Sequence, residues 1–471
     1  MGSLLEVNSD PRCVTRAEAP VLRYWSPMRA FRDLRRDPLR FFTDAARLGD
    51  VVRLQTWFLR AYLVSHPAHI RYVLKDNHRN YRNEDRFNRI FQRAGGDGLL
   101  TTDGDSWRRQ RRLSQPAFSR ERAAEAVSVM SAETAAMLEC WAAGAAIGAQ
   151  VELCREMTRL TLQIAGRAFC GADMSGSADT FADAMAVGFE HFHHRLYNAF
   201  TIPERIPTRR NLRFRAASRI AVAFIESVIE PVLGGTEITG GAGEHGDSAA
   251  NLLALLNGAE RAPSERPLTR AQVRDAIITF FGAASESTAV ALAWIWYLVA
   301  THPEVERRLR REIAAALCGR TPAARDLANL RYTRMVIQEA LRLYPPAWMM
   351  LRTAIADDEI GGCHVPAGST LLMSPWVTHR RADLWNDPLR FDPERFSPER
   401  SDGRLEYSFV PFGGGPRHCI GEEFAMAEMT LVVAMIAQRF RLRLLPGHQV
   451  EPCVVFTMRP RNGVVVTLDP L

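Results

Sequence analysis

The sequence contains very little lysine. Lys75 is the only lysine, so nearly all of the 60 basic residues in this 471-residue chain are arginines. The arginines are spread along the chain without a long basic run or interleaved aromatic residues, so the net charge of +7 does not predict a nucleic-acid-binding surface. A basic face that docks an acidic protein partner fits this distribution better.

Paired cysteines are also missing. The eight cysteines form no C-x-x-C pair and have no regular spacing; they stand at positions 13, 140, 154, 170, 318, 363, 419 and 453. This spacing argues against a disulfide framework and predicts a reduced, cytoplasmic protein. Residues 1–30 contain no apolar run of signal-peptide length, so we expect a partly irregular N-terminal extension, without export or a membrane anchor.

One segment alone, residues 276–300, is long and apolar enough to suggest a membrane span. Four polar residues (Ser285, Glu286, Ser287 and Thr288) lie in its middle, where a carboxylate is costly in lipid. The segment therefore predicts a buried helix of a large soluble domain, with a membrane-embedded helical protein as the alternative. Because a buried carboxylate needs a partner or a chemical task, this cluster is a candidate site.

Hydrophobic periodicity predicts a mainly α-helical chain with a smaller β portion, in one domain over residues 1–471. Helices are expected at residues 38–48, 105–115, 121–142, 151–169, 213–233, 270–300, 303–317, 332–343 and 421–440. Strands are expected at VVRLQT from 51, AYLVS from 61, STLLMSPW from 369, FRLRLLP from 440 and GVVVTL from 463. The Gly-rich segment 234–248 reads as a surface loop or a boundary.

The stretch PFGGGPRHCIG, residues 411–421, carries the strongest chemical signal. Cys419 lies just before the helix expected at 421–440, and the positive end of that helix favours a thiolate. Three glycines upstream let the backbone approach a flat group closely, and Arg417 offers a bidentate fork to a carboxylate beside it. A thiolate, a glycine loop and an arginine together describe a seat for haem iron and its propionates.

The same stretch matches the pattern F-x-x-G-x-R-x-C-x-G at every specified position, and it resembles the haem-binding signature of the cytochrome P450 superfamily. The matching residues are Phe412, Gly415, Arg417, Cys419 and Gly421. The alternative is a buried structural cysteine in a glycine turn. The resemblance implies heme b (iron protoporphyrin IX) ligated by Cys419, and a P450 fold with a long central helix over the haem.

The resemblance extends to the segment EALR, which matches the family's E-x-x-R pattern. It places Glu339 and Arg342 one turn apart on a helix, and FDPERF supplies Arg395 at the position of their usual partner. These three residues are thus expected to form a buried triad that braces the haem-binding loop. E-x-x-R alone is a weak signal, and its place between the central helix and the cysteine loop strengthens it.

Further basic residues match positions that bind haem propionates in the family. Trp107 and Arg111 fit the W-x-x-x-R helix, and Arg352 follows the E-x-x-R helix at a third such position. The neighbouring arginines of that first helix are interpreted instead as a solvated face that docks an acidic redox partner; they are Arg108, Arg109 and Arg112.

The polar cluster AASEST resembles the family's oxygen-activation motif, with Glu286 on the acid position and Ser287 on the alcohol position. An acid and an alcohol can supply protons while O2 is reduced. Two positions depart from the motif. Ser287 lacks the methyl group that restricts a threonine's rotamers, and Ala284 replaces the usual glycine. Thr288 offers an alternative hydroxyl, or it bonds its own backbone.

The resemblance also assigns residues to a substrate pocket. They are Phe87, Phe91, Phe280, Ala283, Ala284, Trp348, Met349, Phe456 and Thr457. Most are large and apolar, which predicts a lipophilic substrate such as a terpenoid, polyketide, fatty acyl or steroid-like molecule; core packing is the alternative for each. The HFHH run at 191–194 lacks an obvious further ligand, so surface or pocket histidines are favoured over a metal site.

The sequence thus predicts a haem-thiolate monooxygenase of secondary metabolism that uses O2 to hydroxylate or epoxidise a lipophilic molecule. The chain shows no flavin or ferredoxin module, so electrons from NAD(P)H are expected through a separate ferredoxin and ferredoxin reductase. A monomer is expected. The alternatives are a peroxygenase, isomerase or dehydratase that does not insert oxygen from O2, and a haem-binding sensor without catalysis.

Overall fold

The structure is a computed structural model that describes residues 18–22, 27–55, 60–198, 201–233, 252–257 and 268–471. The Gly-rich segment 234–248 and most of the N-terminal extension lie outside the described residues. Contacts group the chain into two compact units. Unit 1 comprises Met1–Phe87, Leu341–Asp392 and Phe396–Cys419; unit 2 comprises Asn88–Ala340, Pro393–Arg395 and Ile420–Leu471. A single domain over residues 1–471 stays a prediction.

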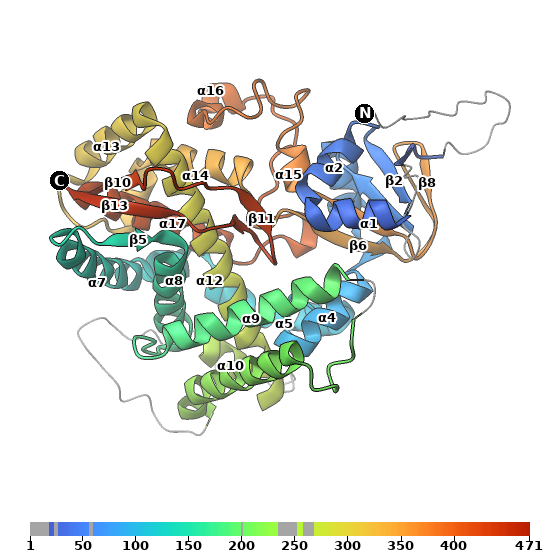
Figure 1. Ribbon diagram of the computed structural model, residues 1–471, viewed down its shortest axis with the longest axis horizontal. Helices are drawn as coiled ribbons and strands as arrows, with labels where there is room; N and C mark the ends of the chain where they lie inside the picture. Colours follow the sequence, from blue (N-terminus) through green and yellow to red (C-terminus); the bar gives the residue numbers. More distant parts are fainter. Residues whose placement is uncertain (1–17, 23–26, 56–59, 199–200, 234–251, 258–267) are drawn as a thin grey trace. The chain divides into compact units, whose positions relative to one another are not determined.

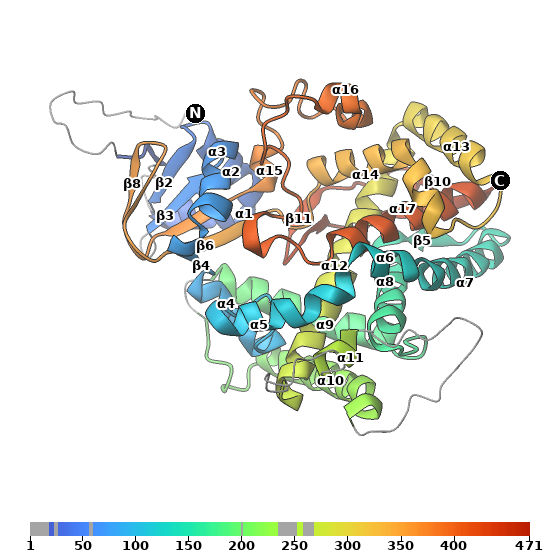
Figure 2. The same cartoon turned by 180° about the vertical axis from the view of Figure 1, so that it is seen from behind.

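Unit 1 contains a six-stranded sheet in the order β1-β2-β3-β9-β6-β4 and a separate β7-β8 pair. Its strands are β1 (Val21–Leu22), β2 (Val51–Gln55), β3 (Arg60–Val64), β4 (Tyr81–Arg82), β6 (Met350–Ala354), β7 (Asp358–Ile360), β8 (Cys363–Val365) and β9 (Thr370–Met373). Its helices and turns are α1 (Pro27–Arg36), α2 (Pro38–Ala46), α3 (Pro67–Arg71), η1 (Tyr72–Asp76), η2 (His78–Asn80), α15 (Pro375–Thr378), α16 (Pro398–Ser401) and η6 (Gly415–Arg417). Helix α2 packs against β2 and β3 (Figure 2).

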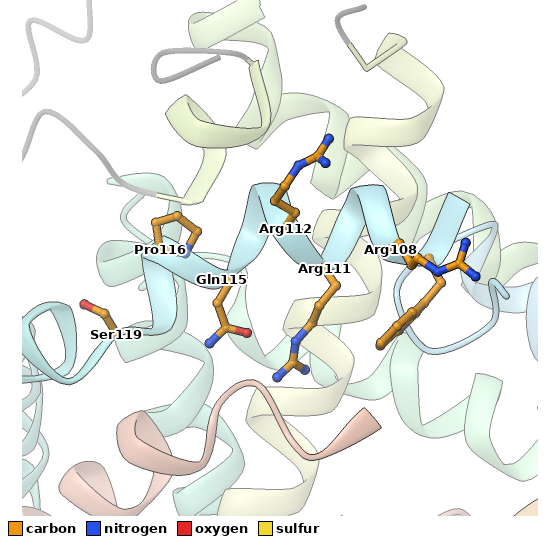
Figure 3. Close-up of a pocket in the computed structure, with 7 residues that line it drawn as sticks. Arg108, Arg111, Arg112, Gln115, Pro116 and Ser119 are labelled. Atoms are coloured by element: carbon orange, nitrogen blue, oxygen red, sulfur yellow. The ribbon is translucent and has the colours of Figure 1, made fainter. Parts of the chain in front are cut away.

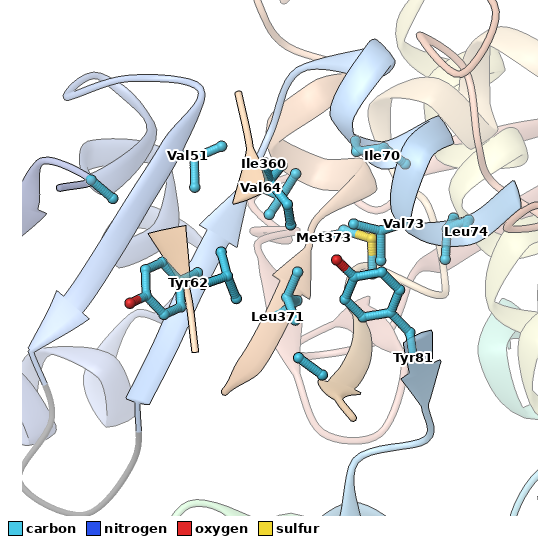
Figure 4. Close-up of a cluster of buried hydrophobic side chains, with 13 residues drawn as sticks. Val51, Tyr62, Val64, Ile70, Val73, Leu74, Tyr81, Ile360, Leu371 and Met373 are labelled. Carbon is cyan, nitrogen blue, oxygen red and sulfur yellow. The ribbon is translucent and has the colours of Figure 1, made fainter. Parts of the chain in front are cut away.

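An apolar cluster holds this sheet to the segment that follows α3. Side chains of β3 and β9, such as Val64, Leu371 and Met373, gather beside Val73 and Leu74 of η1 (Figure 4). In β3, four consecutive residues are buried, which is the pattern of a strand covered on both faces. The cluster therefore fixes η1, whose backbone contacts the cysteine loop.

Unit 2 is mainly helical. Its elements are α5 (Gly104–Ser114), η3 (Gln115–Phe118), α6 (Arg120–Glu125), α7 (Val127–Ala145), α8 (Leu153–Cys170), α9 (Ala178–Leu196), α10 (Arg209–Leu233), α11 (Leu252–Asn257), α12 (Arg270–Thr301), α13 (Pro303–Leu317), η4 (Ala324–Asn329) and α17 (Glu422–Arg439). Strands β5 (Gln150–Glu152), β10 (Phe440–Leu444) and β13 (Val465–Pro470) form one antiparallel sheet, and β11 (Pro452–Val454) pairs with β12 (Met458–Pro460). Three elements cross a unit boundary: α4 (Asp85–Gly95), α14 (Arg331–Leu343) and η5 (Pro393–Phe396).

Helix α12 is the long central helix that the sequence predicts, and α8 packs along it (Figure 1). It begins with a capping box, in which the Thr269 side chain accepts from the Gln272 N–H and the Gln272 side chain accepts from the Thr269 N–H. Among the described residues it is the one helix long and apolar enough to cross a membrane, and 83% of that apolar window is buried inside the protein. Such burial is typical of a core helix.

The structure confirms a mainly helical fold with small sheets, but several predicted boundaries are wrong; the helix expected at 213–233 begins at Arg209, and the strand expected from 463 is Val465–Pro470. The helix expected at 121–142 is two helices, α6 and α7, separated at Ala126. Residues 150–152 form strand β5, because Glu152 caps α8 by accepting from the N–H groups of Cys154 and Arg155. Strand β9 ends at Met373, since the proline that follows has no N–H to donate and begins helix α15.

Helix α14 carries a fully buried arginine into unit 1. The Arg342 guanidinium donates to the carbonyls of His379 and Pro388, both at 2.7 Å, and to that of Arg390 at 3.2 Å. It also lies 5.0 Å from the centre of the Trp385 ring. Because a buried cation must be satisfied, these carbonyls hold residues 379–390 against the helix.

One turn earlier, in unit 2, α14 carries a fully buried acid. The Glu339 Oε1 lies 3.2 Å from the Nε of Arg395, and this arginine is also buried. Removing one partner of such a pair leaves an uncompensated charge in the core.

We predict that Glu339→Ala lowers the free energy of unfolding by about 3–5 kcal/mol, because it removes the carboxylate that pairs with the buried Arg395 guanidinium. Unfolding followed by circular dichroism measures the change. Glu139→Ala is the control, since it removes a surface acid that lies 2.6 Å from Arg439 with a 70%-exposed side chain. The control should unfold like the wild type, and equal losses in both variants would contradict the assigned role of burial.

Candidate functional site

Cys419 stands at the end of a tight loop in unit 1, and the residue is exposed. Its N–H donates to the Phe412 carbonyl at 2.9 Å, and the His418 N–H donates to the Gly415 carbonyl at 3.0 Å. Gly413 and Gly415 have φ values of 73° and 66°, in the left-handed region that favours glycine. The loop thus presents one cysteine from a closely constrained backbone.

Gly415 is also required by close packing. A Cβ at this position would lie 1.8 Å from the carbonyl oxygen of Leu74 in η1. The Gly415 N–H donates to the Tyr407 hydroxyl at 3.2 Å. The sequence suggested that these glycines make room for a flat ligand, whereas at Gly415 the approaching group is the protein's own backbone. In unit 2, a Cβ at Gly421 would lie 3.9 Å from Phe118, which is ordinary contact.

A histidine that the sequence analysis did not single out supports this loop. His379 is fully buried; its Nε2 accepts from the Val410 N–H at 2.9 Å, so its Nδ1 carries the proton and donates to the Arg342 carbonyl at 3.2 Å. Burial, then the Arg342 and Arg380 charges, hold the pKa of His379 well below its usual value. The ring is therefore neutral and structural, and no motif in the sequence indicated it.

The predicted basic residues of unit 1 lie on β6 and η6. The Arg352 Nη1 donates to the Leu351 carbonyl at 2.7 Å and to the Asn83 side chain at 3.3 Å. Arg352 and Arg417 are both half-buried, the latter two residues before Cys419. Both residues are therefore partly accessible in unit 1.

Within unit 2, α12 has an unusual stretch of small residues near its middle. Ala283 is exposed and Ala284 and Ser287 are half-buried, although most of this helix is buried. The Ser287 hydroxyl donates to the Ala283 carbonyl at 2.6 Å. Thr288 is buried. The exposed stretch therefore offers backbone-level access and one hydroxyl, at the site the sequence predicts for oxygen activation.

Glu286 has a different surrounding from Ser287. Its carboxylate accepts from the Thr457 hydroxyl at 2.6 Å and from the Arg459 guanidinium at 2.7 and 2.9 Å. The sequence analysis assigned Thr457 to the pocket and did not single out Arg459. The buried acid thus has the partner that its burial requires.

Helix α5 carries the other predicted basic site, in unit 2. A surface hollow of about 520 Å³ is lined by Trp107, Arg108, Arg111, Arg112, Gln115, Pro116 and Ser119. Arg111 and Arg112 point to opposite sides of the helix (Figure 3). Arg108 and Arg112 are exposed, as predicted for a solvated face, whereas Arg109 and Arg111 are half-buried. Contact of Arg111 with a ligand stays a prediction.

Phenylalanines from three segments meet in unit 2. The Phe456 ring stacks on Phe189 with centroids 4.7 Å apart and planes 6° apart. Phe91 and Phe192 lie 5.4 and 5.6 Å from the same ring. The structure therefore brings Phe456 and Phe91 together, as a shared pocket wall would require, and adds Phe189.

Other predicted pocket residues pack within the units. Phe280 is buried and stacks with Phe118 at 5.1 Å. Trp348 is 4% exposed and lies 5.9 Å from the Phe42 ring, so its surroundings are those of a core residue. Two more are half-buried: Phe87 and Met349. Contact of these side chains with a substrate stays a prediction.

The histidines of the HFHH run do not converge. His191 pairs with Glu204, His193 contacts the Val455 carbonyl, and His194 contacts Asn198. Among the described residues, one group has ligand atoms close enough for a metal ion: Asp50, His66 and His69. There, Arg381 donates to Asp50 at 2.7 Å and the Ala68 N–H donates to His66, so existing hydrogen bonds engage two of these three residues.

Comparison with known proteins decides the family. The family model described as Cytochrome P450 matches residues 30–467. The chain belongs to the cytochrome P450 family. It is 34% identical to the cyclooctat-9-en-7-ol 5-monooxygenase of Streptomyces melanosporofaciens, covering 88% of this chain and 86% of that protein. It is 32% identical to the pentalenene oxygenase of Streptomyces avermitilis, with 91% and 92% covered.

The solved structure of a cytochrome P450 (CYP102L1) resembles the fold of this P450. The TM-score is 0.81 at 25% identity, covering 92% of this chain and 98% of that one. Family membership implies haem iron and the use of O2 by a cytochrome P450 monooxygenase. The predictions of the superfamily, of the P450 fold and of a monooxygenase are thus confirmed.

The residues of this P450 fit a haem. Cys419 supplies an exposed thiol on a constrained loop, and thiolate is the proximal ligand of a haem-thiolate iron. Arg352 and Arg417 supply guanidinium groups in the same unit, suited to carboxylates. In unit 2, the small residues Ala283, which is exposed, and Ala284, which is half-buried, suit the close approach of a flat group. Cys419 would therefore hold the iron, and the arginines would hold the propionates.

We predict that Gly415→Ala destabilises the P450 by at least about 2 kcal/mol, because alanine is strained at positive φ and its Cβ meets the Leu74 carbonyl. The expected result is a lower haem content per chain and a lower unfolding midpoint. Gly403→Ala is the matched control, since Gly403 has a φ of 71° with nothing within 4 Å of the added Cβ. Equal losses of stability and haem content in both variants would mean that strain at positive φ alone causes them, and would contradict a contribution from the contact with the Leu74 carbonyl.

Proposed function

We propose that this P450 inserts one oxygen atom from O2 into a lipophilic terpenoid by hydroxylation or epoxidation, with electrons delivered from NAD(P)H by a separate ferredoxin and its reductase. The observation that carries the proposal is the exposed Cys419 thiol on a loop whose backbone requires glycine at position 415. A thiolate in this setting is the feature that separates oxygen-inserting haem proteins from carriers with a histidine ligand.

When bound through Cys419, haem supplies O2 activation, which the electron donation of the thiolate promotes. The chain supplies the remaining functions. Arg352 and Arg417 orient the cofactor through its carboxylates, and the Ser287 hydroxyl passes protons at the exposed stretch of α12. Glu286, held by Thr457 and Arg459, is the carboxylate nearest to this hydroxyl in sequence.

Two observations support a terpenoid substrate. The relatives at 34% and 32% identity are named for cyclooctat-9-en-7-ol and pentalenene. The four rings of the aromatic cluster around Phe456 are apolar, and Phe456 itself is half-buried. Such rings fit a compact hydrocarbon better than a charged metabolite.

The proposal of an acidic ferredoxin as the electron donor rests on the positive charge of helix α5. Arg108 and Arg112 are exposed on α5, and such a basic face suits an acidic ferredoxin that binds transiently. A cytoplasmic monomer that meets such a donor in solution completes the proposal.

The first test is the absorption spectrum of the reduced protein with carbon monoxide. We expect a strongly red-shifted Soret band that Cys419→His abolishes, because a thiolate and an imidazole donate different electron density to the iron. Cys140→Ser is the control, since Cys140 is a second exposed cysteine. A red-shifted band that survives in Cys419→His would refute Cys419 as the ligand.

A second prediction concerns Ser287. We expect Ser287→Ala to lower the product formed per NAD(P)H at least twofold and to raise hydrogen peroxide release, because it removes the half-buried hydroxyl of the exposed stretch. Ser285→Ala is the matched control, since the Ser285 hydroxyl is buried and bonds the Phe281 carbonyl. Unchanged product yield in Ser287→Ala would remove this hydroxyl from the mechanism.

A further inference from the structure

The hairpin formed by β11 and β12 contacts two helices of unit 2 at nearly every residue of its tip. The Val455 carbonyl contacts the His193 ring of α9 at 2.9 Å, and Phe456 stacks on Phe189 of the same helix. The Met458 carbonyl accepts from the Trp294 indole of α12 at 3.0 Å. The tip is therefore tied to both helices and cannot shift freely against either.

The same tip holds the acid of α12. The Thr457 hydroxyl donates to Oε1 of Glu286 at 2.6 Å, and one nitrogen of Arg459 lies 2.7 and 2.9 Å from its two oxygens. The carboxylate side chain is 7% exposed and that of Arg459 is 29% exposed. Charge-assisted hydrogen bonds of this length in a buried place are strong and directional.

The other ionisable groups nearby do not compete for this arginine. Cys154 lies close enough to interact with both charges, but burial raises the pKa of its thiol well above the usual range, so it is neutral. Burial also raises the pKa of the Cys453 thiol, the other cysteine that interacts with Arg459. The next arginine of the hairpin, Arg461, is 3.6 Å from Glu451 in an exposed pair. Glu286 is therefore the charge that Arg459 compensates.

The side chains of Glu286 and Ser287 point in different directions, although the two residues are adjacent in the helix. Successive residues of an α-helix point about 100° apart, so a side chain held toward the hairpin does not point where its neighbour points. The rotamer of Glu286 then depends on its two hairpin partners. Without them, a buried carboxylate has to take up a proton or turn away, and its place relative to Ser287 is lost.

We propose that Arg459 and Thr457 are positioning residues for oxygen activation: the hairpin tip holds Glu286 in one place, and this determines how much of the electron input escapes as hydrogen peroxide. The inference rests on the proposed function, since it concerns the protons consumed when O2 is reduced. It adds to that function a residue of the hairpin that lies outside the predicted motifs.

The electron balance makes the effect measurable without knowing the substrate. Release of peroxide takes O2, NAD(P)H and one proton to H2O2 and NAD(P)+. Full reduction takes O2, two NAD(P)H and two protons to two waters and two NAD(P)+. Oxygen insertion takes the substrate, O2, one NAD(P)H and one proton to the oxygenated product, one water and one NAD(P)+. The fraction of NAD(P)H electrons recovered as peroxide therefore reports how well protons are supplied.

The experiment uses the holoenzyme with a plant ferredoxin and its reductase as electron donors, without substrate and with pentalenene as the probe. We expect the peroxide fraction to rise at least twofold in Arg459→Met, and to fall back toward the wild-type value in Arg459→Lys. Thr457→Val, which keeps the side-chain shape and removes the donor, should raise it by a smaller factor. Arg461→Met is the matched control and should match the wild type, because Arg461 is exposed and pairs elsewhere.

A double mutant separates positioning from stability. If Arg459 acts through Glu286, the double variant Glu286→Gln/Arg459→Met should release no more peroxide than Glu286→Gln alone. Additive effects would overturn the proposal, as would an unchanged or lower peroxide fraction in both Arg459→Met and Thr457→Val. Should Arg459→Met fail to fold, Thr457→Val still decides. Wild-type protein that consumes no O2 would refute the proposed function, whereas O2 consumption with unchanged peroxide would refute this inference alone.

Discussion

The buried guanidinium of Arg342 is the constraint on which the cysteine loop depends. Because a cation inside the protein must be satisfied, it holds the carbonyls of residues 379–390 around it. The first of these residues, His379, bonds back to Arg342 and on to the Val410 N–H. The Val410 carbonyl in turn accepts from the Gly413 N–H at 3.2 Å. A continuous chain of hydrogen bonds thus runs from α14 into the loop that ends at Cys419.

A second constraint acts in unit 2, where a buried acid lies within the long apolar helix α12. Arg459 and Thr457 satisfy Glu286 from the β11–β12 hairpin, while Ser287 lies in a half-buried stretch. Two adjacent residues of the helix therefore differ: the Glu286 carboxylate is anchored, and the Ser287 hydroxyl lies in the half-buried stretch. The hairpin that anchors the charge also carries Phe456, so the aromatic cluster and the acid share one support.

Much of the fold and part of the site could be predicted from short patterns. The P450 signature around Cys419, the E-x-x-R helix and the polar centre of α12 are local, and residues a few positions apart in a regular element have a known geometry. The predicted core helix covers nearly the whole of α12. Boundaries were less reliable at β5 and β9, where capping by Glu152 and a proline outweighed periodicity.

The sequence by itself indicated the family, which the comparisons confirm, and the need of Glu286 for a partner; Cys419 as the iron ligand stays a prediction. Only the tertiary structure decided which partner that is, since Arg459 is 173 positions away in the chain and is one of many arginines. His379 is likewise an ordinary histidine in the sequence, and its role comes from burial beside Arg342 and Val410. Local sequence patterns predict a helix, a loop or a buried charge, because neighbouring residues have a known geometry. Which distant segments pair with them depends on how the chain packs.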